Sequence, residues 1–244
     1  MKAVIFCGGE GIRLRPLTLD IPKPLVPIQG KPVIEHLFDF FKECGIKDIV
    51  LTTCYLKEKI KEKYTEGDLV GLNINYIEEE NLMGTANHIE LARQYLTETF
   101  VVSNGDELKN FDMAEMLQLH KETGALVTIA IKEVPDPSSF GTVKLEGNKI
   151  VQFVEKPKKE EAPSNFISTG FYIMEPEVIN YIPKSYSMLE KEIFPKLAQE
   201  GKLFGYKFQG QWFDTGTFER LATAEKEWKG ITKKFDNYLS GVGF

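Results

Sequence analysis

The sequence predicts an α/β protein built around a mainly parallel central sheet. In the first half of the chain, short apolar runs alternate with amphipathic stretches, and this alternation is typical of parallel strands covered by helices on both faces. In the second half the apolar runs are separated by turn residues such as Gly147-Asn148, which predicts a smaller, more antiparallel lobe. We therefore expect one domain over 1–228, with lobes of about 1–125 and 126–228, followed by a tail over 229–244.

The elements of the first lobe follow from the spacing of apolar residues. The apolar run within 2–6 is typical of a buried strand. Ile34, Leu37, Phe38 and Phe41 recur at helical spacing, which predicts a helix over 33–44 that ends at Gly45. The same reasoning predicts, in chain order, a strand over 48–53, a helix over 56–64, a strand over 72–77, a helix over 86–94 and a strand over 99–103.

The second lobe contains more strands than helices. The expected strands are 126–131, 142–145, 150–154, 167–174 and 203–208, with helical stretches near 175–181 and 189–199 and a last helix over 217–228. Ligands of parallel α/β sheets bind beyond the carboxyl ends of the strands. We therefore expect the segments 8–18, 81–85 and 104–107 to gather along one edge of the sheet.

Composition excludes several classes of protein. The formal net charge of −6 argues against a nucleic-acid-binding surface, because phosphate backbones select for basic faces. The three cysteines, Cys7, Cys44 and Cys54, are not spaced as metal ligands are. The simplest interpretation is that they are reduced thiols in a cytosol. The chain has neither a signal-peptide pattern nor an apolar run of the ~20 residues that span a bilayer. We expect a cytoplasmic protein with no nucleic-acid or membrane partner.

The stretch CGGEGIRLRPLT, at residues 7–18, predicts a phosphate-binding loop. The backbone amides of Gly8, Gly9 and Gly11 can wrap a polyphosphate, with Arg13 close behind. The P-loop pattern is excluded because no Lys-Ser or Lys-Thr pair follows Gly11, and the dinucleotide pattern because Leu14 replaces its third glycine. A glycine-rich turn with solvated arginines remains the alternative.

Prolines constrain the segments around this loop. Pro16 supplies no amide and ends any early helix, so we expect the loop to be extended. Lys23 lies between Pro22 and Pro24, and such a lysine has little conformational freedom to lose on binding. A cation at this position therefore supports the prediction of an anion site.

Further motifs follow the loop, and together they carry a resemblance to a known family. The chain resembles the sugar-1-phosphate nucleotidylyltransferases over residues 1 to about 225. The matching motifs, in order, are Gly8-Gly9-x-Gly11-x-Arg13-Leu14-x-Pro16-Leu17-Thr18, Pro22-Lys23-Pro24-Leu25, Leu82-Met83-Gly84-Thr85-Ala86, Asn104-Gly105-Asp106, Phe153-Val154-Glu155-Lys156-Pro157, Ser168-Thr169-Gly170-Phe171-Tyr172 and Trp212-Phe213-Asp214-Thr215-Gly216-Thr217. Each motif alone is weak, but their order is specific.

The resemblance implies a Rossmann-like three-layer nucleotidyltransferase fold with a nucleotide lobe and a sugar lobe. It also implies a reaction in which a sugar 1-phosphate attacks the α-phosphorus of a nucleoside triphosphate and releases pyrophosphate. A phosphate is already a nucleophile at neutral pH, so no general base is needed. We expect no catalytic role for the three histidines, of which His36 and His120 would be surface or packing residues.

Two carboxylates match the magnesium ligands of the family. Asp106 follows an apolar strand, and Asp214 precedes the loop that enters the last helix. Mg²⁺ takes oxygen ligands and keeps several waters while it bridges substrate phosphates, so it is the expected cofactor. The alternatives are a turn or helix-cap role for Asp106 and a helix N-cap role for Asp214.

The remaining roles are also implied by the resemblance. Arg13 and Lys23 would be catalytic cations that neutralise charge on the triphosphate. The residues expected to bind the nucleotide are Gly8, Gly9, Gly11, Arg13, Gly84 and Thr85. Those expected to bind the sugar phosphate are Glu155, Lys156, Thr169 and Gly170. For Lys156 the alternative is a solvated hairpin lysine.

Two residues depart from the family pattern. Ile12 stands where the family often has a threonine, so phosphate binding would depend on backbone amides alone. Ser168-Thr169 precede Gly170 where an asparagine is common, which leaves the hydroxyl pattern of the sugar open. We expect no left-handed β-helix domain, because only about 28 residues follow the Asp214 loop.

Other activities on similar folds are weaker interpretations. A phosphocholine cytidylyltransferase would have no use for the 153–157 motif, and residues 104–108 do not form the Asp-x-Asp pair of glycosyltransferases. A non-catalytic regulatory subunit would be expected to lack one of the four charged residues predicted to act on the phosphates and the metal, and all four are present: Arg13, Lys23, Asp106 and Asp214. We expect mannose or glucose 1-phosphate as acceptor and GTP, UTP or dTTP as donor. Among the branches of the family, we favour the one that resembles the mannose-1-phosphate guanylyltransferases. The sequence does not decide whether the protein forms a homo-oligomer.

Overall fold

The computed structural model describes residues 1–80 and 83–231. The chain forms two compact units: unit 1 comprises Met1–Leu82, Ser103–Ala114 and Gln209–Phe244, and unit 2 comprises Met83–Val102 and Glu115–Phe208, each as far as it is described. This division differs from the expected boundary near residue 125. The segment that follows residue 208 belongs with unit 1 because it forms a strand there.

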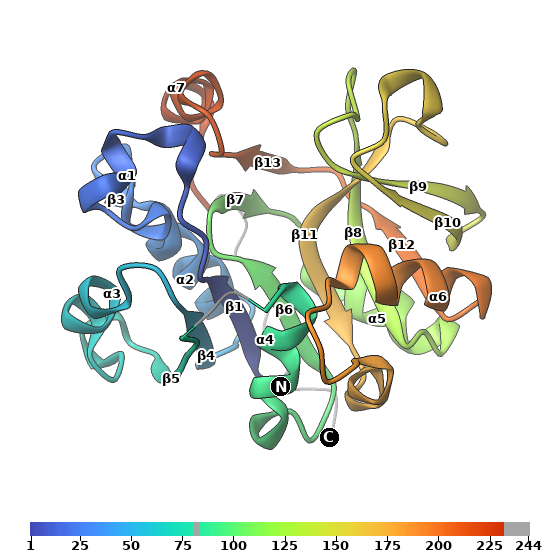
Figure 1. The fold of residues 1–244 in the computed structure, drawn as a ribbon, viewed down its shortest axis with the longest axis horizontal. Helices are drawn as coiled ribbons and strands as arrows, with labels where there is room; N and C mark the ends of the chain where they lie inside the picture. The colour runs from blue at the N-terminus through green and yellow to red at the C-terminus, as the bar shows by residue number, and fades with distance from the viewer. Residues whose placement is uncertain (81–82, 232–244) are drawn as a thin grey trace. The chain divides into compact units, whose positions relative to one another are not determined.

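A parallel sheet forms the centre of unit 1. β1 pairs with β4 and β4 with β5, both in parallel, as the alternation of strands and helices predicted. In Figure 1 these strands are the dark blue to cyan arrows. Unit 1 contains β1 (Ala3–Cys7), α1 (Leu17–Asp20), β2 (Pro27–Ile28), β3 (Lys31–Pro32), α2 (Val33–Glu43), β4 (Asp48–Thr53), α3 (Lys57–Tyr64), β5 (Asn73–Glu78), β7 (Glu107–Asn110), β13 (Gln211–Asp214) and α7 (Phe218–Glu227).

The helices of unit 1 are held by their aromatic residues. The Phe38 ring of α2 packs edge-on against Tyr64 of α3 at 5.2 Å between centroids. The Tyr64 hydroxyl donates a hydrogen bond to Glu35 of α2 at 3.0 Å. On α2, Phe40 also contacts Phe111, which follows β7, at 5.3 Å. The apolar face predicted for residues 33–44 is therefore the face that joins α2 to its neighbours.

The short antiparallel pair of β7 and β13 was not predicted. Asp214 lies opposite Glu107 and Trp212 opposite Lys109. Each strand has only four residues and carries charged or polar side chains, so neither shows the apolar run that identified the other strands. This pair draws the segment after residue 208 into unit 1 and positions both aspartates expected to bind magnesium.

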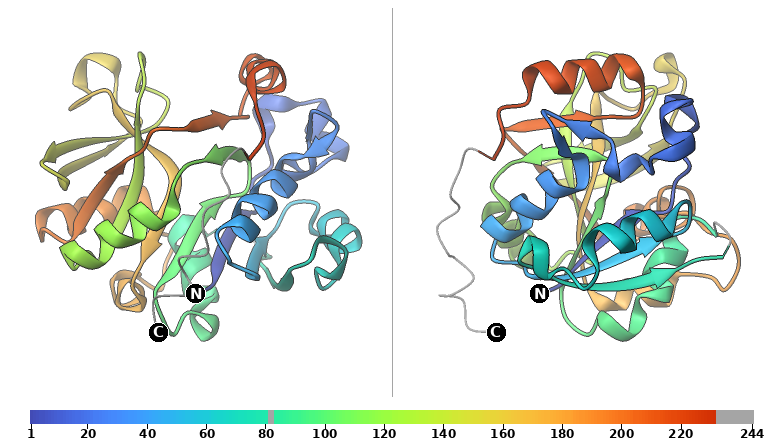
Figure 2. Two further views of the ribbon diagram at one scale, coloured as in Figure 1. Left: turned by 180° about the vertical axis from the view of Figure 1, so that it is seen from behind. Right: turned by 90° about the vertical axis from the view of Figure 1, so that its left-hand side faces the viewer.

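Unit 2 contains the more antiparallel sheet, in the order β6-β11-β8-β12-β10-β9. β8 is antiparallel to β11 and parallel to β12, while β10 is antiparallel to both β12 and β9. Figure 2 shows this unit from two further sides. Its elements are α4 (Thr85–Leu91), β6 (Phe100–Asn104), α5 (Met113–Thr123), β8 (Val127–Glu133), β9 (Gly141–Glu146), β10 (Lys149–Glu155), β11 (Phe166–Met174), a π-helix (Leu189–Ile193), α6 (Phe194–Gln199) and β12 (Leu203–Lys207), with β6 and α5 crossing into unit 1 at their ends.

The core of unit 2 lies between its sheet and α6. Phe194 of α6 contacts Phe153 of β10 at 5.2 Å and Tyr172 of β11 at 5.0 Å. The hairpin expected around Gly147-Asn148 is confirmed as β9 and β10. Over residues 1–80 and 83–231, none of the helices has the length and apolar character needed to cross a bilayer.

Candidate active site

The glycine loop follows β1 and folds back on itself. Gly11 has φ +64°, and its carbonyl accepts hydrogen bonds from the Leu14 amide at 2.8 Å and the Thr18 hydroxyl at 2.9 Å. A 3₁₀ turn (Ile12–Leu14) and the single turn α1 follow. The expectation that Pro16 would keep the loop extended is therefore wrong. Pro16 occupies the N-cap of α1, where its missing amide removes no helical hydrogen bond.

A cavity of about 350 Å³ opens beside this loop in unit 1. Its lining brings together several of the residues predicted from separate motifs, and those that matter here are Gly9, Gly11, Arg13, Lys23, Asp106 and Gly216. The amide of Gly105 donates to the Phe6 carbonyl at 3.0 Å, which fixes the Asp106 turn next to the carboxyl end of β1. The expected meeting of segments 8–18 and 104–107 is therefore confirmed.

Lys23 and Asp106 form an ion pair in this cavity. Lys23 is only 8% exposed. Because lysine is almost never buried without a partner, the ion pair with Asp106 accounts for this burial. Burial by itself lowers the pKa of Lys23, but Asp106, followed by Asp214 and Glu107, raises it above its ordinary value. For the Asp106 carboxyl, burial by itself raises the pKa, but Lys23 outweighs burial and lowers the pKa below its ordinary value. Both groups are therefore charged at neutral pH.

The β7–β13 pair holds Asp214 near Asp106. Asp106 immediately precedes β7, Asp214 ends β13, and the Thr215 hydroxyl donates to the Asp106 carbonyl at 2.7 Å. One Asp214 oxygen accepts the Gly216 amide at 2.7 Å, and the other accepts the guanidinium of Arg220. The N-cap of α7 is Thr217, whose side chain accepts the Arg220 amide. The alternative that Asp214 caps this helix is wrong.

A second buried ion pair joins Lys109 to Glu107, the residue that follows Asp106, and the sequence analysis did not identify it. The Lys109 ammonium, 1% exposed, is 3.1 Å from Glu107 and donates to the Ser103 hydroxyl at 3.0 Å. Glu107 also accepts hydrogen bonds from the Asn104 amide at 2.9 Å and the Trp212 indole at 3.0 Å. The one signal in the sequence was the alternation of Glu107 and Lys109 with apolar Leu108.

The donor set fits a magnesium ion that is carried by a nucleotide. Asp106 and Asp214 provide ionisable carboxylate oxygens, the ligand type that Mg²⁺ prefers. Within the described part of the chain, no group of three or more His, Cys, Asp or Glu side chains gathers into a metal cage. Two carboxylates with the remaining positions filled by water and phosphate is the usual arrangement for such a magnesium. The residues are therefore suited to the expected ion.

In unit 2, Glu155 is the last residue of β10 and Lys156 follows it. Their side chains form an ion pair at 3.2 Å, and the Lys156 side chain is 63% exposed. Lys156 has φ +44°, a left-handed conformation uncommon for a side-chain-bearing residue, and its amide donates to the Phe140 carbonyl at 3.0 Å. Such backbone outliers gather at ligand sites. Gly141, which the sequence analysis missed, packs where a Cβ would meet the Glu155 carboxylate at 2.9 Å.

The other two residues expected at the sugar lie within β11. Thr169 is fully buried, and its hydroxyl donates to the Ala130 carbonyl of β8 at 2.8 Å. Gly170, with φ +59°, lies at an irregularity in the pairing between Ser168 and Tyr172. The Thr169 hydroxyl is thus engaged within the sheet, and the backbone irregularity at Gly170 is the feature that this segment offers to a ligand.

Gly84 and Thr85 begin α4 in unit 2. Gly84 has φ +90°, and a Cβ there would collide with the Ser187 carbonyl. The Thr85 hydroxyl donates to Glu190 at 2.6 Å and accepts the Leu189 amide at 2.9 Å. Burial raises the pKa of the Glu190 carboxyl. The sequence analysis had not identified Glu190 as a residue of interest. These contacts join α4 to the π-helix; the preceding Asn81 and Leu82 lie outside the described residues.

Two of the histidines are packing residues, as expected. His36 accepts the Trp228 indole N–H at 3.1 Å while its other ring nitrogen lies 3.1 Å from the Ile28 carbonyl. His120 is hydrogen bonded to Thr128 at 2.8 Å and to Glu175 at 3.0 Å. Burial lowers the pKa of both rings.

A parallel sheet with a cavity at the carboxyl end of its first strand is typical of α/β proteins that bind their ligands at that edge. A sequence model of the nucleotidyl transferase family matches residues 2–229. The chain therefore belongs to that family, and the resemblance seen in its motifs is confirmed.

Individual relatives agree with this assignment. The mannose-1-phosphate guanylyltransferase catalytic subunit beta of Xenopus tropicalis is 40% identical over 88% of this chain and 61% of that protein. The UTP–glucose-1-phosphate uridylyltransferase of Synechocystis is 38% identical over 88% of this chain and 60% of that one. The crystal structure of HddC from Yersinia pseudotuberculosis, complexed with GMP-PN, is 26% identical with a TM-score of 0.79 and covers 93% of this chain and 99% of its own. The chain thus spans about 60% of the length of the two curated relatives.

Proposed function

We propose that the protein transfers a nucleoside monophosphate from a nucleoside triphosphate to a sugar 1-phosphate, giving a nucleotide sugar and pyrophosphate. The observation that carries this proposal is the cavity of unit 1, where a glycine loop, Arg13, Lys23 and Asp106 converge. Backbone amides and two cations suit a polyphosphate, and one carboxylate beside them suits its magnesium ion. Membership of the nucleotidyl transferase family supports it.

The proposed reaction needs alignment and charge neutralisation and no general base. An oxygen of the ionised sugar phosphate attacks the α-phosphorus, and the bond from that phosphorus to the β-phosphate oxygen breaks with its electron pair passing to pyrophosphate. Lys23 stays protonated beside Asp106 and neutralises the α-phosphate. Arg13, exposed on the loop, stabilises the leaving pyrophosphate. Glu155 and Lys156 of unit 2 bind the sugar hydroxyls and the sugar phosphate.

Magnesium is the proposed cofactor, with Asp106 and Asp214 as its protein ligands. When bound, it supplies charge neutralisation and orientation of the phosphates. The protein's task is to hold these two carboxylates at fixed positions, to which the β7–β13 pair and the Thr215 hydrogen bond contribute. A cytoplasmic location belongs to the same proposal and is supported by the three free cysteines. The oligomeric state is not part of this proposal.

Mannose 1-phosphate and GTP are the substrates that we propose first. The Xenopus relative is named for that pair, and the Yersinia structure is bound to GMP-PN. Glucose 1-phosphate with UTP is the second candidate, because the Synechocystis relative is named for it.

A pyrophosphate-release assay tests the proposal. ATP, CTP, GTP, UTP and dTTP are each paired with mannose, glucose, galactose and N-acetylglucosamine 1-phosphates, and with phosphocholine as the acceptor of the alternative enzyme. The expected result is release that requires both a sugar 1-phosphate and magnesium, with the nucleotide sugar identified by mass spectrometry. Release with phosphocholine alone would favour the cytidylyltransferase alternative. No release with any pair would favour a non-catalytic subunit.

A further inference from the structure

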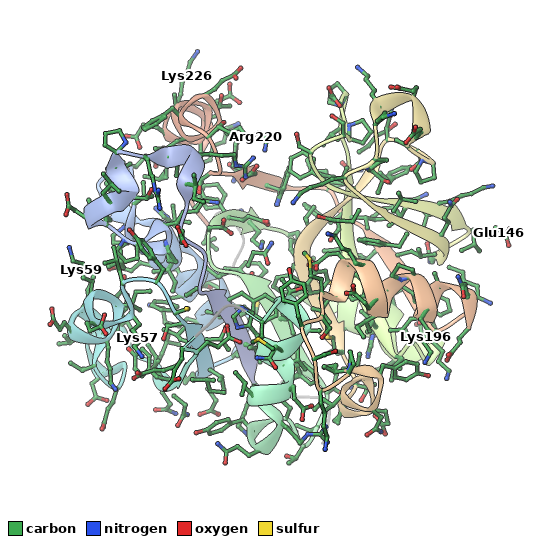
Figure 3. The ribbon with its side chains drawn as sticks, viewed as in Figure 1. Lys57, Lys59, Glu146, Lys196, Arg220 and Lys226 are labelled. Carbon is green, nitrogen blue, oxygen red and sulfur yellow. The ribbon has the colours of Figure 1, made fainter. Side chains whose placement is uncertain are left out.

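Arg220 is a charged residue of unit 1 to which neither the sequence motifs nor the proposed reaction gives a role. It lies in the first turn of α7, its guanidinium contacts Asp214, and its side chain is 30% exposed. Figure 3 shows Arg220 on the side of α7 next to β13, while Lys226 points away from that strand. Cations are disfavoured in the first turn of a helix, because the helix dipole is positive there. Such an arginine needs an anion, and Asp214 provides one.

A second arginine flanks the same turn. A Cβ placed on Gly216 would meet the Arg13 guanidinium at 2.7 Å and the Asp214 carboxylate at 2.8 Å. Gly216 also lines the phosphate cavity. Both Arg13 and Arg220 therefore lie close to the turn from Asp214 to Gly216. A guanidinium is well suited to phosphate, because its planar array of donors matches two oxygens at once.

Each carboxylate oxygen of Asp214 accepts one hydrogen bond in this structure. One oxygen accepts the Gly216 amide, and the other accepts Arg220. A divalent cation bound to either oxygen of Asp214 would lie close to the Arg220 guanidinium, and the two positive charges would repel each other. The Arg220 side chain is 30% exposed, so it is not enclosed by the protein. A phosphate bound in the cavity beside Gly216 would be an anion to which its guanidinium could turn.

We propose that Arg220 is a further substrate-binding residue, which pairs with Asp214 in the metal-free site and contacts a substrate phosphate once Asp214 binds magnesium. The proposal rests on the assignment of Asp214 as a metal ligand in the proposed function. It makes Arg220 a competitor of the metal and a partner of the phosphate. Loss of its charge must then act in opposite directions on the two ligands, which a merely structural ion pair would not do.

The test compares Arg220→Met with Arg220→Lys and with Lys226→Met, a matched change on the same helix at an exposed position. Mn²⁺ binding without nucleotide is measured by electron paramagnetic resonance. Pyrophosphate binding at saturating Mg²⁺ is measured by calorimetry, with mannose 1-phosphate as a second arm that distinguishes the source of the phosphate. Circular dichroism and tryptophan fluorescence check that each variant folds.

Arg220→Met is expected to bind Mn²⁺ roughly threefold to tenfold more tightly, because a competing cation is gone. The same variant is expected to bind one of the two phosphate ligands about tenfold to a hundredfold more weakly. Arg220→Lys should fall between wild type and Arg220→Met for the phosphate, and Lys226→Met should match wild type in both measurements.

Weaker Mn²⁺ binding by Arg220→Met would overturn the proposal, because it would make Arg220 only a support for Asp214. Unchanged binding of both phosphate ligands would overturn it as well. Wild-type protein that bound neither Mn²⁺ nor pyrophosphate would instead refute the proposed function. If wild type bound pyrophosphate but Arg220→Met behaved like Lys226→Met, the proposal for Arg220 alone would be wrong and the proposed function would stand.

Discussion

The candidate sites of the two units differ in how far their paired cations are exposed to solvent. In unit 1, Lys23 is buried beside Asp106 and Arg220 is partly buried beside Asp214, while Arg13 is exposed on the glycine loop. In unit 2 the corresponding cation, Lys156, also pairs with a carboxylate, Glu155, but its side chain is 63% exposed. Pairing in the protein interior fixes positions before a ligand arrives, whereas an exposed lysine adapts to the ligand that it meets.

The difference suggests a division of labour. Charge that develops in a transition state is best stabilised by groups that need not reorganise, and the network around Asp106 has this character. Recognition of a sugar phosphate requires only that a flexible cation be available near Glu155. Substitutions in unit 1 should therefore change turnover or stability, and those in unit 2 should change the apparent affinity for one substrate.

The largest effect is expected for Asp106→Asn. The substitution removes a proposed magnesium ligand and the anion that keeps Lys23 paired, so kcat should fall by at least roughly 10²- to 10³-fold. Pyrophosphate release at saturating substrate measures this fall, and circular dichroism checks the fold. Asp68→Asn, at an exposed position of the same unit, is the control. In wild type, a chelator should stop the reaction and added magnesium should restart it. Full turnover by Asp106→Asn would remove the metal assignment.

Lys109→Met should have the next largest effect, on the stability of unit 1. It leaves Glu107 buried without its cation, which typically costs about 3–5 kcal/mol. The double variant Glu107→Gln/Lys109→Met should recover much of that loss. Urea denaturation measures both, followed by the fluorescence of Trp212 and Trp228, the two tryptophans of the chain, which both belong to unit 1.

The loss in Lys109→Met should grow with pH. Burial already raises the pKa of Glu107 above its ordinary value although Lys109 opposes this, and removal of Lys109 should raise it further. Above the ordinary carboxyl pKa, the unfolded state gives up the proton that the folded state retains, so the free energy of unfolding falls as pH rises toward the folded pKa. Denaturation at pH 5 and pH 8 would show this. A pH-independent loss would mean that Lys109 contributes packing alone.

A smaller effect should separate Lys156→Ala from Arg13→Ala. Each removes a charged hydrogen bond to phosphate worth about 1.5–3 kcal/mol, or roughly tenfold to a hundredfold. Lys156→Ala should raise the KM for sugar 1-phosphate, while Arg13→Ala should lower kcat, because its contact strengthens as charge passes to pyrophosphate. Lys158→Ala, an exposed neighbour whose Glu161 partner is 3.5 Å away, is the control. Equal weakening of the same substrate by both variants would contradict the division of labour.

The sequence was most informative where local physics decides the outcome. The strands over 48–53 and 167–174 and the helix over 33–44 were predicted to within a residue or two, because their apolar spacing is set by the period of each element. The meeting of the glycine loop with Asp106 was also predictable, since the carboxyl ends of neighbouring parallel strands share one edge.

Other features depended on partners distant in the chain. β7 and β13 have four residues each and little apolar character, and they form strands only because they pair across a separation of about a hundred residues. The glycine loop was expected to be extended, but the hydrogen bond from Thr18 to the Gly11 carbonyl curls it. Glu107 and Lys109 look like surface residues until the chain folds around them.

The sequence by itself determined the family and the α/β class, and it supplied the residues proposed for the phosphate chemistry, because motifs and periodicity are local properties. The tertiary structure alone decided how the charges are paired: Lys23 with Asp106, Lys109 with Glu107 and Arg220 with Asp214. It also decided that residues after 208 belong with unit 1. The physical reason is that an ion pair or a short strand is stable only where burial and long-range pairing repay its desolvation and its loss of conformational entropy.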